Sequence, residues 1–230
     1  MLGSFYKLPL PLTARDQLEH SIGPAIVEAA EQAADAGGLA LLLALVALDE
    51  DGISASARSA AERLVCSGMQ DPPWASEIGH PEFIDAWMLE DVYGDQTAYF
   101  ATFRYEGRDP HVVTAVYDEN LGGIIKDAFA GYPKDPEEAR RRAELEPGAA
   151  VSDADPGVMA TKVIEAIHSG DLYLDNDWTP DFKEMRALLL QRMRLLPAAT
   201  LQEPAPPNDE RRRRSCPGPR VSCAPFAIVD

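Results

Sequence analysis

Three short runs rich in Val, Thr, Phe, Tyr and Trp constrain the fold of this chain more than any other feature. They cover residues 86–93, 97–105 and 111–118, and turn residues separate them. Runs of this composition are typical of β-strands. The connections are too short to cross over a sheet, so the three strands must be antiparallel neighbours. The sequence therefore predicts an antiparallel meander of three strands, or slightly more.

The middle run indicates how this sheet is covered. Tyr99, Ala101 and Phe103 alternate with Phe100 and Thr102, so one face of the sheet is more apolar than the other. A sheet this small is stable only when a helix layer covers its apolar face. Helical spacing of apolar residues occurs on both sides of the meander. We therefore expect an α+β fold in which N-terminal and C-terminal helices cover the meander.

The N-terminal layer is expected over residues 13–69, which are rich in Ala, Gly and Leu. Gly23-Pro24 should end one helix and begin the next, because Pro suits the first helical position. Gly37-Gly38 should end that second helix. The expected helices span about 13–22, 24–36, 40–48 and 55–68.

The C-terminal layer is expected over residues 119–196. Its first helix should begin at Leu121, directly after the meander at 86–118, because apolar residues then recur at helical spacing. Three further helices have clear start signals, in which Asp or Thr precedes Pro. The apolar stripe consists of Leu121, Ile124, Ile125, Ala128 and Phe129, and the start signals are Asp135-Pro136, Asp155-Pro156 and Thr179-Pro180.

These layers and the meander predict a single domain over residues 13–196. Residues 1–12 contain two prolines and are expected to form an N-terminal arm. Residues 197–230 contain seven prolines, a run of four arginines at 211–214 and no apolar periodicity. This composition is typical of a disordered tail.

The charge of the chain excludes some partners and favours others. The formal net charge is −17. A body this acidic repels nucleic-acid phosphates and anionic membranes, so nucleic-acid binding is unlikely and no membrane association is expected. It favours a protein partner with a basic surface. The first thirty residues lack the basic and apolar regions of a secretion signal, so we expect a cytoplasmic protein.

One candidate ligand site lies where the last strand should run into the Leu121 helix. Asn120 can cap this helix, and Gly122 and Gly123 would leave its first turn bare. Free backbone N–H groups there, together with Lys126, could bind an anion. The alternative is packing, in which the two glycines let the helix approach the sheet or an aromatic side chain such as Trp87.

Carboxylates around the meander are the second candidate. Asp91, Asp118 and Asp127 are weak candidates for a catalytic or acid/base set. The four histidines are scattered and show no metal-ligand spacing, so neither a metal nor a cofactor is expected. Cys66 lies in a helical pattern with no basic neighbour except Arg63, which favours a buried structural thiol.

Part of the chain resembles a family of uncharacterised hypothetical proteins of high-GC bacteria. The resemblance covers about residues 70–197. It depends on the segment WMLEDVYGDQTAYFATFRYEGRDPHVVTAVYDENLGGIIKDAF and on the later helix MRALLLQRMRLLP. Its most specific parts are the NLGGxxKDAF pattern and the PPW at 72–74. The resemblance implies no activity.

These features leave three functional hypotheses. The first is a non-catalytic cytoplasmic protein that binds a protein partner through the meander or the helix that follows it. The second is a small enzyme or ligand-binding module with a site at residues 118–127. The third, which the body charge disfavours, is nucleic-acid contact through the arginine-rich tail.

Overall fold

A computed structural model describes residues 12–48, 53–133, 135–172 and 179–197. All of them fall within one unit of the chain, Met1–Ala199. The predicted arm lies outside the described residues except for Leu12, and the predicted tail lies outside them except for Pro197. The disorder of the tail therefore remains a prediction.

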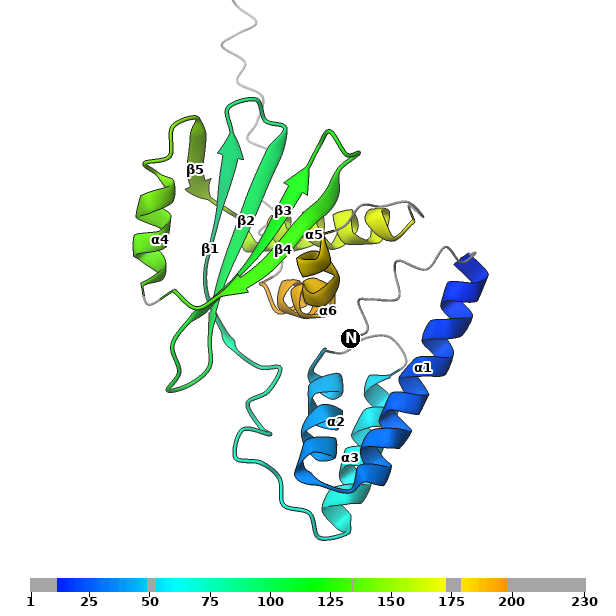
Figure 1. Cartoon of the computed structure of the whole chain (residues 1–230). Helices are drawn as coiled ribbons and strands as arrows, with labels where there is room; N and C mark the ends of the chain where they lie inside the picture. Colours follow the sequence, from blue (N-terminus) through cyan, green and yellow to red (C-terminus); the bar gives the residue numbers. More distant parts are fainter. Residues whose placement is uncertain (1–11, 49–52, 134, 173–178, 198–230) are drawn as a thin grey trace, which may run out of the picture. The chain divides into compact units, whose positions relative to one another are not determined.

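The described residues form six helices and five strands, which confirms the predicted α+β class (Figure 1). Helices flank a sheet that contains the expected meander. In chain order the elements are α1 (Leu12–Ala33), α2 (Ala36–Leu48), α3 (Ser54–Cys66), β1 (Glu82–Asp91), β2 (Gln96–Arg104), β3 (His111–Asp118), β4 (Ile124–Gly131), α4 (Pro136–Ala143), β5 (Ala149–Asp153), α5 (Pro156–Asp171) and α6 (Pro180–Arg194).

The sheet has the strand order β4-β3-β2-β1-β5, and every neighbouring pair is antiparallel. The three predicted strands lie at its centre, each paired with the next. Two strands that the sequence did not indicate, β4 and β5, form the edges. The meander is thus part of a larger sheet.

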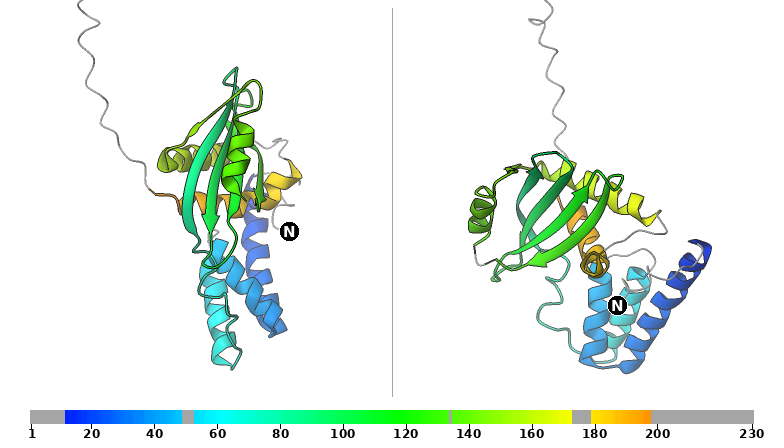
Figure 2. Two further views of the ribbon diagram at one scale, coloured as in Figure 1. Left: turned by 90° about the vertical axis from the view of Figure 1, so that its left-hand side faces the viewer. Right: turned by 45° about the horizontal axis from the view of Figure 1, so that its top comes forward.

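Helices α5 and α6 pack against one face of the sheet (Figure 2). This is the face predicted to be apolar, because alternate residues of the strands point into one core. The core side chains of the strands include Tyr99, Ala101, Phe103, Val113 and Ala115, and those of the helices include Met159, Val163, Ile167, Phe182, Leu189 and Met193.

The opposite face of the sheet has an aromatic pair at its centre. Trp87 is paired with Phe100 across β1 and β2, and their rings stack with centroids 3.8 Å apart. Trp87 is nevertheless only 4% exposed. The short helix α4 lies on this side, since its Arg140 contacts Asp85 and Asp153, which share a face with Trp87.

The prediction of a helix that begins at Leu121 is wrong, because residues 124–131 form strand β4. Gly122 and Gly123 have φ angles of 86° and 77°, which turn the chain back instead of starting a helix. Residues 124–131 then pair with β3. Leu121 and Phe129, two members of the predicted apolar stripe, are exposed.

Residues 119–196 are consequently not a purely helical layer, because they contain both β4 and β5. The three predicted helix starts are confirmed, however. The carboxylate of Asp135 accepts hydrogen bonds from Glu137 and Glu138 N–H at the start of α4. Asp155 and Thr179 cap α5 and α6 in the same manner.

The N-terminal helices α1, α2 and α3 surround a separate core of small and aliphatic side chains. The break predicted at Gly23-Pro24 is wrong, since α1 continues through Pro24. A Cβ on Gly23 would lie 2.7 Å from the Ile53 side chain, so this glycine permits close packing between α1 and the start of α3. The packing of α1 against its neighbouring helices thus stabilises α1 by more than Pro24 destabilises it.

The helix end predicted at Gly37-Gly38 is also wrong. The turn comes earlier, where Ala34 has a φ of 47° and Asp35 caps α2 by accepting a hydrogen bond from Gly38 N–H at 2.7 Å. A Cβ on Gly38 would lie 2.2 Å from the Ala30 carbonyl oxygen. This glycine therefore lets the first turn of α2 lie directly against the last turns of α1.

Candidate functional site

Three turns meet at one end of the sheet, the upper end in Figure 1. They connect β1 to β2, β3 to β4, and α4 to β5. Backbone hydrogen bonds join them in a row, from Val92 N–H to the Gly148 carbonyl at 3.1 Å and from Glu119 N–H to the Asp95 carbonyl at 2.9 Å. We call this continuous edge, residues 91–95, 118–123 and 144–148, the rim.

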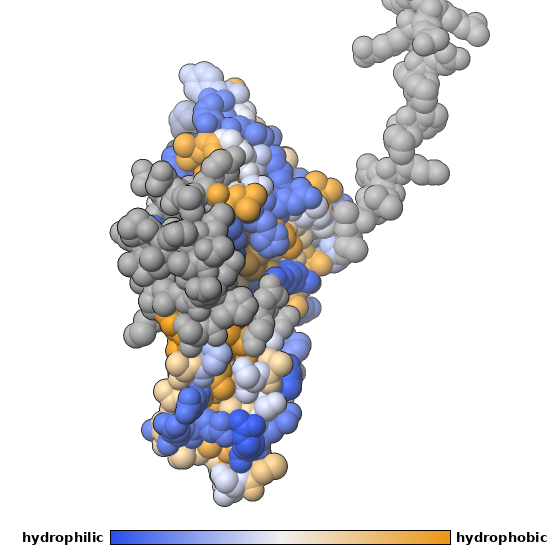
Figure 3. All heavy atoms as spheres, turned by 90° about the vertical axis from the view of Figure 1, so that its right-hand side faces the viewer, coloured by the Kyte–Doolittle hydropathy of each residue, from blue (hydrophilic) through white to orange (hydrophobic). Residues whose placement is uncertain are grey.

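The rim combines carboxylates with exposed apolar side chains. Its acidic residues are Asp91, Asp95, Asp118, Glu119, Glu144 and Glu146, and it contains no Lys, Arg or His. Val92, Tyr93, Leu121 and Leu145 are 66%, 84%, 51% and 81% exposed. Figure 3 shows isolated apolar residues among hydrophilic ones at this upper end. Sequence reasoning missed this surface, although apolar residues beside acids in turn segments are its signal.

Asp118 is the one candidate acid that is buried. It ends β3, and its carboxylate accepts hydrogen bonds from Gln96 Nε2 at 2.8 Å and from Leu121 N–H at 3.2 Å. Lys126 Nζ lies 3.7 Å from the same carboxylate. These contacts close the β3–β4 turn and tie it to β2, so Asp118 has a structural role.

Asp91 and Asp127 do not converge with Asp118 on one site. Asp91 accepts a hydrogen bond from Asp95 N–H at 2.9 Å and closes its own turn. Its strand is separated from that of Asp118 by β2, which corresponds to about 10 Å. Asp127 instead accepts a hydrogen bond from the Thr179 hydroxyl at 2.5 Å and ties β4 to the start of α6.

The candidate anion site at residues 120–126 lacks the helix on which it was predicted. Asn120 and Gly122 are exposed in the turn, while Lys126 pairs with Asp118. Gly123 has little free space, because a Cβ there would lie 2.8 Å from the Tyr117 hydroxyl oxygen. The glycine therefore does accommodate an aromatic side chain, but this side chain is Tyr117 of β3, packed against a turn, and not Trp87 packed against a helix.

Lys162 of α5 lies next to the rim, against Tyr117 and Glu119. Its ammonium group lies 4.2 Å from the centre of the Tyr117 ring and 3.7 Å from the Glu119 carboxylate. Burial works to lower the pKa of Lys162, but the hydroxyl groups of Tyr99 and Tyr117 and the charge of Glu119 outweigh it and hold the pKa above its usual value. Lys162 therefore stays charged and anchors the rim to the helix layer.

A buried polar cluster lies toward the other end of the sheet. Arg192 of α6 donates from Nε to His111 Nε2 at 3.2 Å and from Nη2 to the Tyr105 hydroxyl at 3.1 Å. Its Nη1 donates to the Gln191 side-chain carbonyl. Among the described residues no carboxylate lies within ion-pair distance of Arg192. Sequence reasoning placed His111 at the start of its strand but missed this cluster.

The protonation state of His111 follows from these contacts. Burial and the neighbouring Arg192 lower the pKa of His111 from 6.5 to about 4. The imidazole is therefore neutral near pH 7, with an unprotonated Nε2 that accepts the hydrogen bond from Arg192. The cluster joins α6 to β3 and to Tyr105, the residue that follows β2.

Other sequence expectations concern metals, cysteine and membranes. The part of the chain that the structure describes contains no group of three or more His, Cys, Asp or Glu that could hold a metal ion. Cys66 is exposed, so the predicted burial of its thiol is wrong. Among the described helices, none combines the length and the apolar character needed to cross a bilayer.

Comparison of the chain with protein-family models, with curated proteins and with solved structures finds no match. The resemblance to hypothetical proteins of high-GC bacteria therefore remains a prediction.

Proposed function

We propose that the protein is a non-catalytic binding module that recognises a protein partner with a basic surface through the rim. The observation that carries this proposal is the combination of five solvent-accessible carboxylates and four exposed large apolar side chains on three hydrogen-bonded turns; the sixth carboxylate of the rim, Asp118, is buried. The charges suit a basic partner, and the apolar groups supply area that the partner can bury.

The charge of the rim persists when its neighbours are included. Three cations lie close to its carboxylates: Lys126 beside Asp118, Lys162 beside Glu119, and Arg140 3.8 Å from Glu144. The carboxylates still outnumber these cations two to one. Such a surface attracts cations and repels anions, which also agrees with the expectation that nucleic acid is not the partner.

The apolar side chains supply most of the affinity in this proposal. Tyr93 and Leu145 are more than four-fifths exposed, so each has nearly its whole side chain to bury. Burying a side chain of this size contributes about 1.5–3 kcal/mol, and Tyr is enriched among residues that dominate binding energy. The hydrogen bonds between the turns hold these groups in place before binding, which lowers the entropic cost.

The test compares the rim with equally exposed apolar residues elsewhere. One variant carries Tyr93→Ser and Leu145→Ser, and the control carries Tyr132→Ser and Leu172→Ser, whose side chains are similarly exposed outside the rim. Each full-length protein is immobilised and used at low salt to capture partners from a lysate of the cells that naturally produce it. A captured basic protein is then purified, and its affinity for wild type and both variants is measured by calorimetry.

The proposal expects one stoichiometric basic partner whose affinity falls at least tenfold for the rim variant and stays unchanged for the control, which corresponds to about 1.4 kcal/mol or more. Equal affinity for the rim variant and the wild type would contradict the proposal. So would the absence of any stoichiometric partner.

A further inference from the structure

Each turn of the rim carries at least one exposed large apolar side chain. Leu121 lies in the β3–β4 turn, Tyr93 in the β1–β2 turn and Leu145 in the α4–β5 turn. The strand order β4-β3-β2-β1-β5 places the turns in that order along one edge of the sheet. Neighbouring strands are about 4.8 Å apart, so the centres of the first two turns are two strand spacings, or about 10 Å, apart, and β5 lies about 7 Å beyond the second centre. The three side chains therefore form a row with gaps of about 10 Å and about 7 Å.

This spacing matches one face of an α-helix. A helix rises about 1.5 Å per residue, so residue i+7 lies about 10.5 Å from residue i, and residue i+11 lies about 6 Å farther along. Both are turned by only about 20° from residue i, so all three point to the same side. Residues on one face of an extended strand instead recur about every 6.7 Å, and none of them falls at the 10 Å position.

Carboxylates lie on both sides of the row. Glu119 is on the side of α5, where its carboxylate lies 3.7 Å from Lys162 Nζ. Asp91 is on the opposite face of the sheet, which it shares with Trp87, because alternate residues of a strand point the same way. A complementary partner therefore has cations along both borders of its apolar stripe. A basic amphipathic helix has this pattern.

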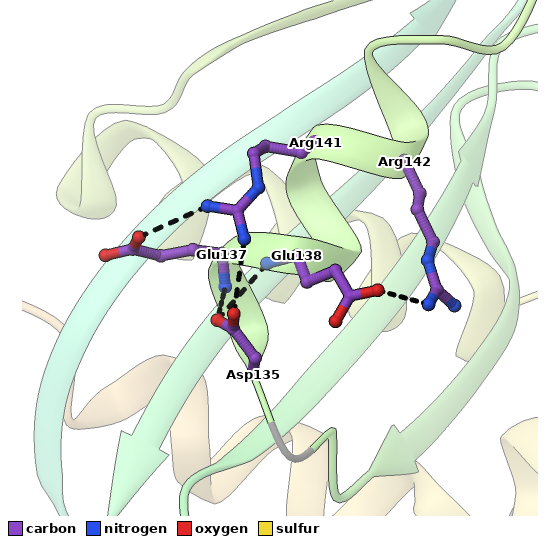
Figure 4. Close-up of polar contacts among 5 residues, drawn as sticks. All are labelled: Asp135, Glu137, Glu138, Arg141 and Arg142. Carbon is purple, nitrogen blue, oxygen red and sulfur yellow. Dashed lines mark hydrogen bonds and ion pairs between the residues drawn. The ribbon is translucent and has the colours of Figure 1, made fainter.

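The Leu145 end of the row is fixed from two directions. The N–H of Leu145 donates to the Arg142 carbonyl of α4 at 3.1 Å, and the Gly148 carbonyl accepts from Val92 N–H in the neighbouring turn. Figure 4 shows the polar contacts that stabilise α4, in which Asp135 caps the first turn, Arg141 lies between Asp135 and Glu137, and Arg142 lies beside Glu138. The row is thus in place before a partner binds, which lowers the entropic cost of binding.

We propose that the segment recognised by the rim is a basic amphipathic α-helix that crosses the three turns. Its apolar residues i, i+7 and i+11 lie on Leu121, Tyr93 and Leu145, and Lys or Arg on its borders face the carboxylates on both sides. This inference rests on the proposed function of the rim and adds the structure of the partner. Because the charges are exposed, the affinity falls as salt is added.

Three synthetic peptides of about 18 residues test the inference. The first is built from Leu, Lys and Ala, with Leu at positions i, i+7 and i+11. An isomer of the same composition and charge has Leu at i, i+5 and i+10, which spreads the three side chains around the helix. The third has Pro in place of one central Ala of the first, which breaks the helix.

The affinity of each peptide for the full-length protein is measured by calorimetry at about 0.02 M NaCl, where the Debye length is roughly 20 Å. The same measurement is made with the variant that carries Tyr93→Ser and Leu145→Ser and with the control that carries Tyr132→Ser and Leu172→Ser. Circular dichroism follows the helix content of each peptide on binding.

We expect the first peptide to bind one to one, at least tenfold more tightly than the isomer and the Pro peptide, and to gain helix on binding. The rim variant should lose this tenfold preference, and the control variant should keep it. Equal affinity of the wild type for all three peptides would overturn the inference, as would the absence of measurable binding by the first. If the three peptides bind equally, weaker binding of all three by the rim variant would leave the proposed function standing, whereas unchanged binding would remove it as well.

Discussion

Buried His111 should make the protein lose stability as the pH falls toward 4. The side chain is 6% exposed and accepts a hydrogen bond from Arg192, and its pKa is about 4 in the folded protein against 6.5 when unfolded. Below pH 6.5 the unfolded chain binds a proton that the folded chain does not bind. Stability is therefore complete above pH 6.5, declines as the pH falls, and levels off below about 4.

The size of this loss follows from the pKa difference. One pKa unit corresponds to about 1.4 kcal/mol, so the free energy of unfolding should fall by about 3 kcal/mol between pH 6.5 and pH 4 because of His111 alone. Carboxylates also titrate in this range, so the contribution of His111 has to be isolated by comparison with variants.

His111→Gln isolates it, because the Gln side-chain oxygen can accept the hydrogen bond from Arg192 without titrating. Urea unfolding of wild type and variant between pH 4 and pH 7.5 should show a weaker pH dependence for the variant, by up to about 1.4 kcal/mol per pH unit near pH 5. His168→Gln, an exposed control, should keep the wild-type dependence. If His111→Gln keeps it as well, the assignment of a buried neutral imidazole is wrong.

Three further changes test local features, each by urea unfolding at pH 7. Gly94→Ala should cost about 1 kcal/mol from its positive φ alone, whereas Gly123→Ala should cost about 2–3 kcal/mol, because its Cβ also meets the Tyr117 hydroxyl; equal losses would argue against that contact. Asp155→Ala should cost about 1 kcal/mol by removing the cap of α5, and a neutral effect would show that the cap contributes nothing. Phe103→Ala should cost about 3–5 kcal/mol through a cavity in the main core, and a loss below 1 kcal/mol would mean that the core collapses around it.

The central meander could be predicted because its evidence is local. β-Branched and aromatic residues mark each strand, and short polar turns leave antiparallel pairing as the only solution. The helix starts at Asp135, Asp155 and Thr179 were predictable for the same reason, since a cap and the following Pro act within a few residues.

Strand β4 could not be predicted, because its sequence suits two periodicities. Ile124, Ile125 and Ala128 are buried in the strand and would also lie on one face of a helix. The decision is made by the backbone at Gly122 and Gly123, where two positive φ angles return the chain to β3. Tertiary pairing thus overrides a helical pattern, as it does for many short apolar runs.

In the candidate site, too, some features could be predicted from local sequence and others depend on tertiary pairing. Asp118 could be singled out at the end of its strand, but its partners Gln96 and Lys126 follow from the pairing of β2, β3 and β4. The rim as a whole required the position of β5, because Leu145 joins Val92 and Tyr93 only when the α4–β5 turn lies beside the β1–β2 turn. Each turn has acids beside apolar residues, but no single turn shows that the three lie next to one another in the fold.

The crowding of carboxylates on the rim has a kinetic consequence. The turns lie on neighbouring strands about 5 Å apart, so their charges act jointly over the Debye length of about 8–10 Å at physiological salt. A joint field of this kind accelerates encounter with a cationic partner. The apolar side chains of the rim, which become buried in the complex, determine how long the complex lasts. Added salt should thus slow association and leave the dissociation rate nearly constant. Loss of Tyr93 or Leu145 should instead leave the association rate nearly constant and speed dissociation.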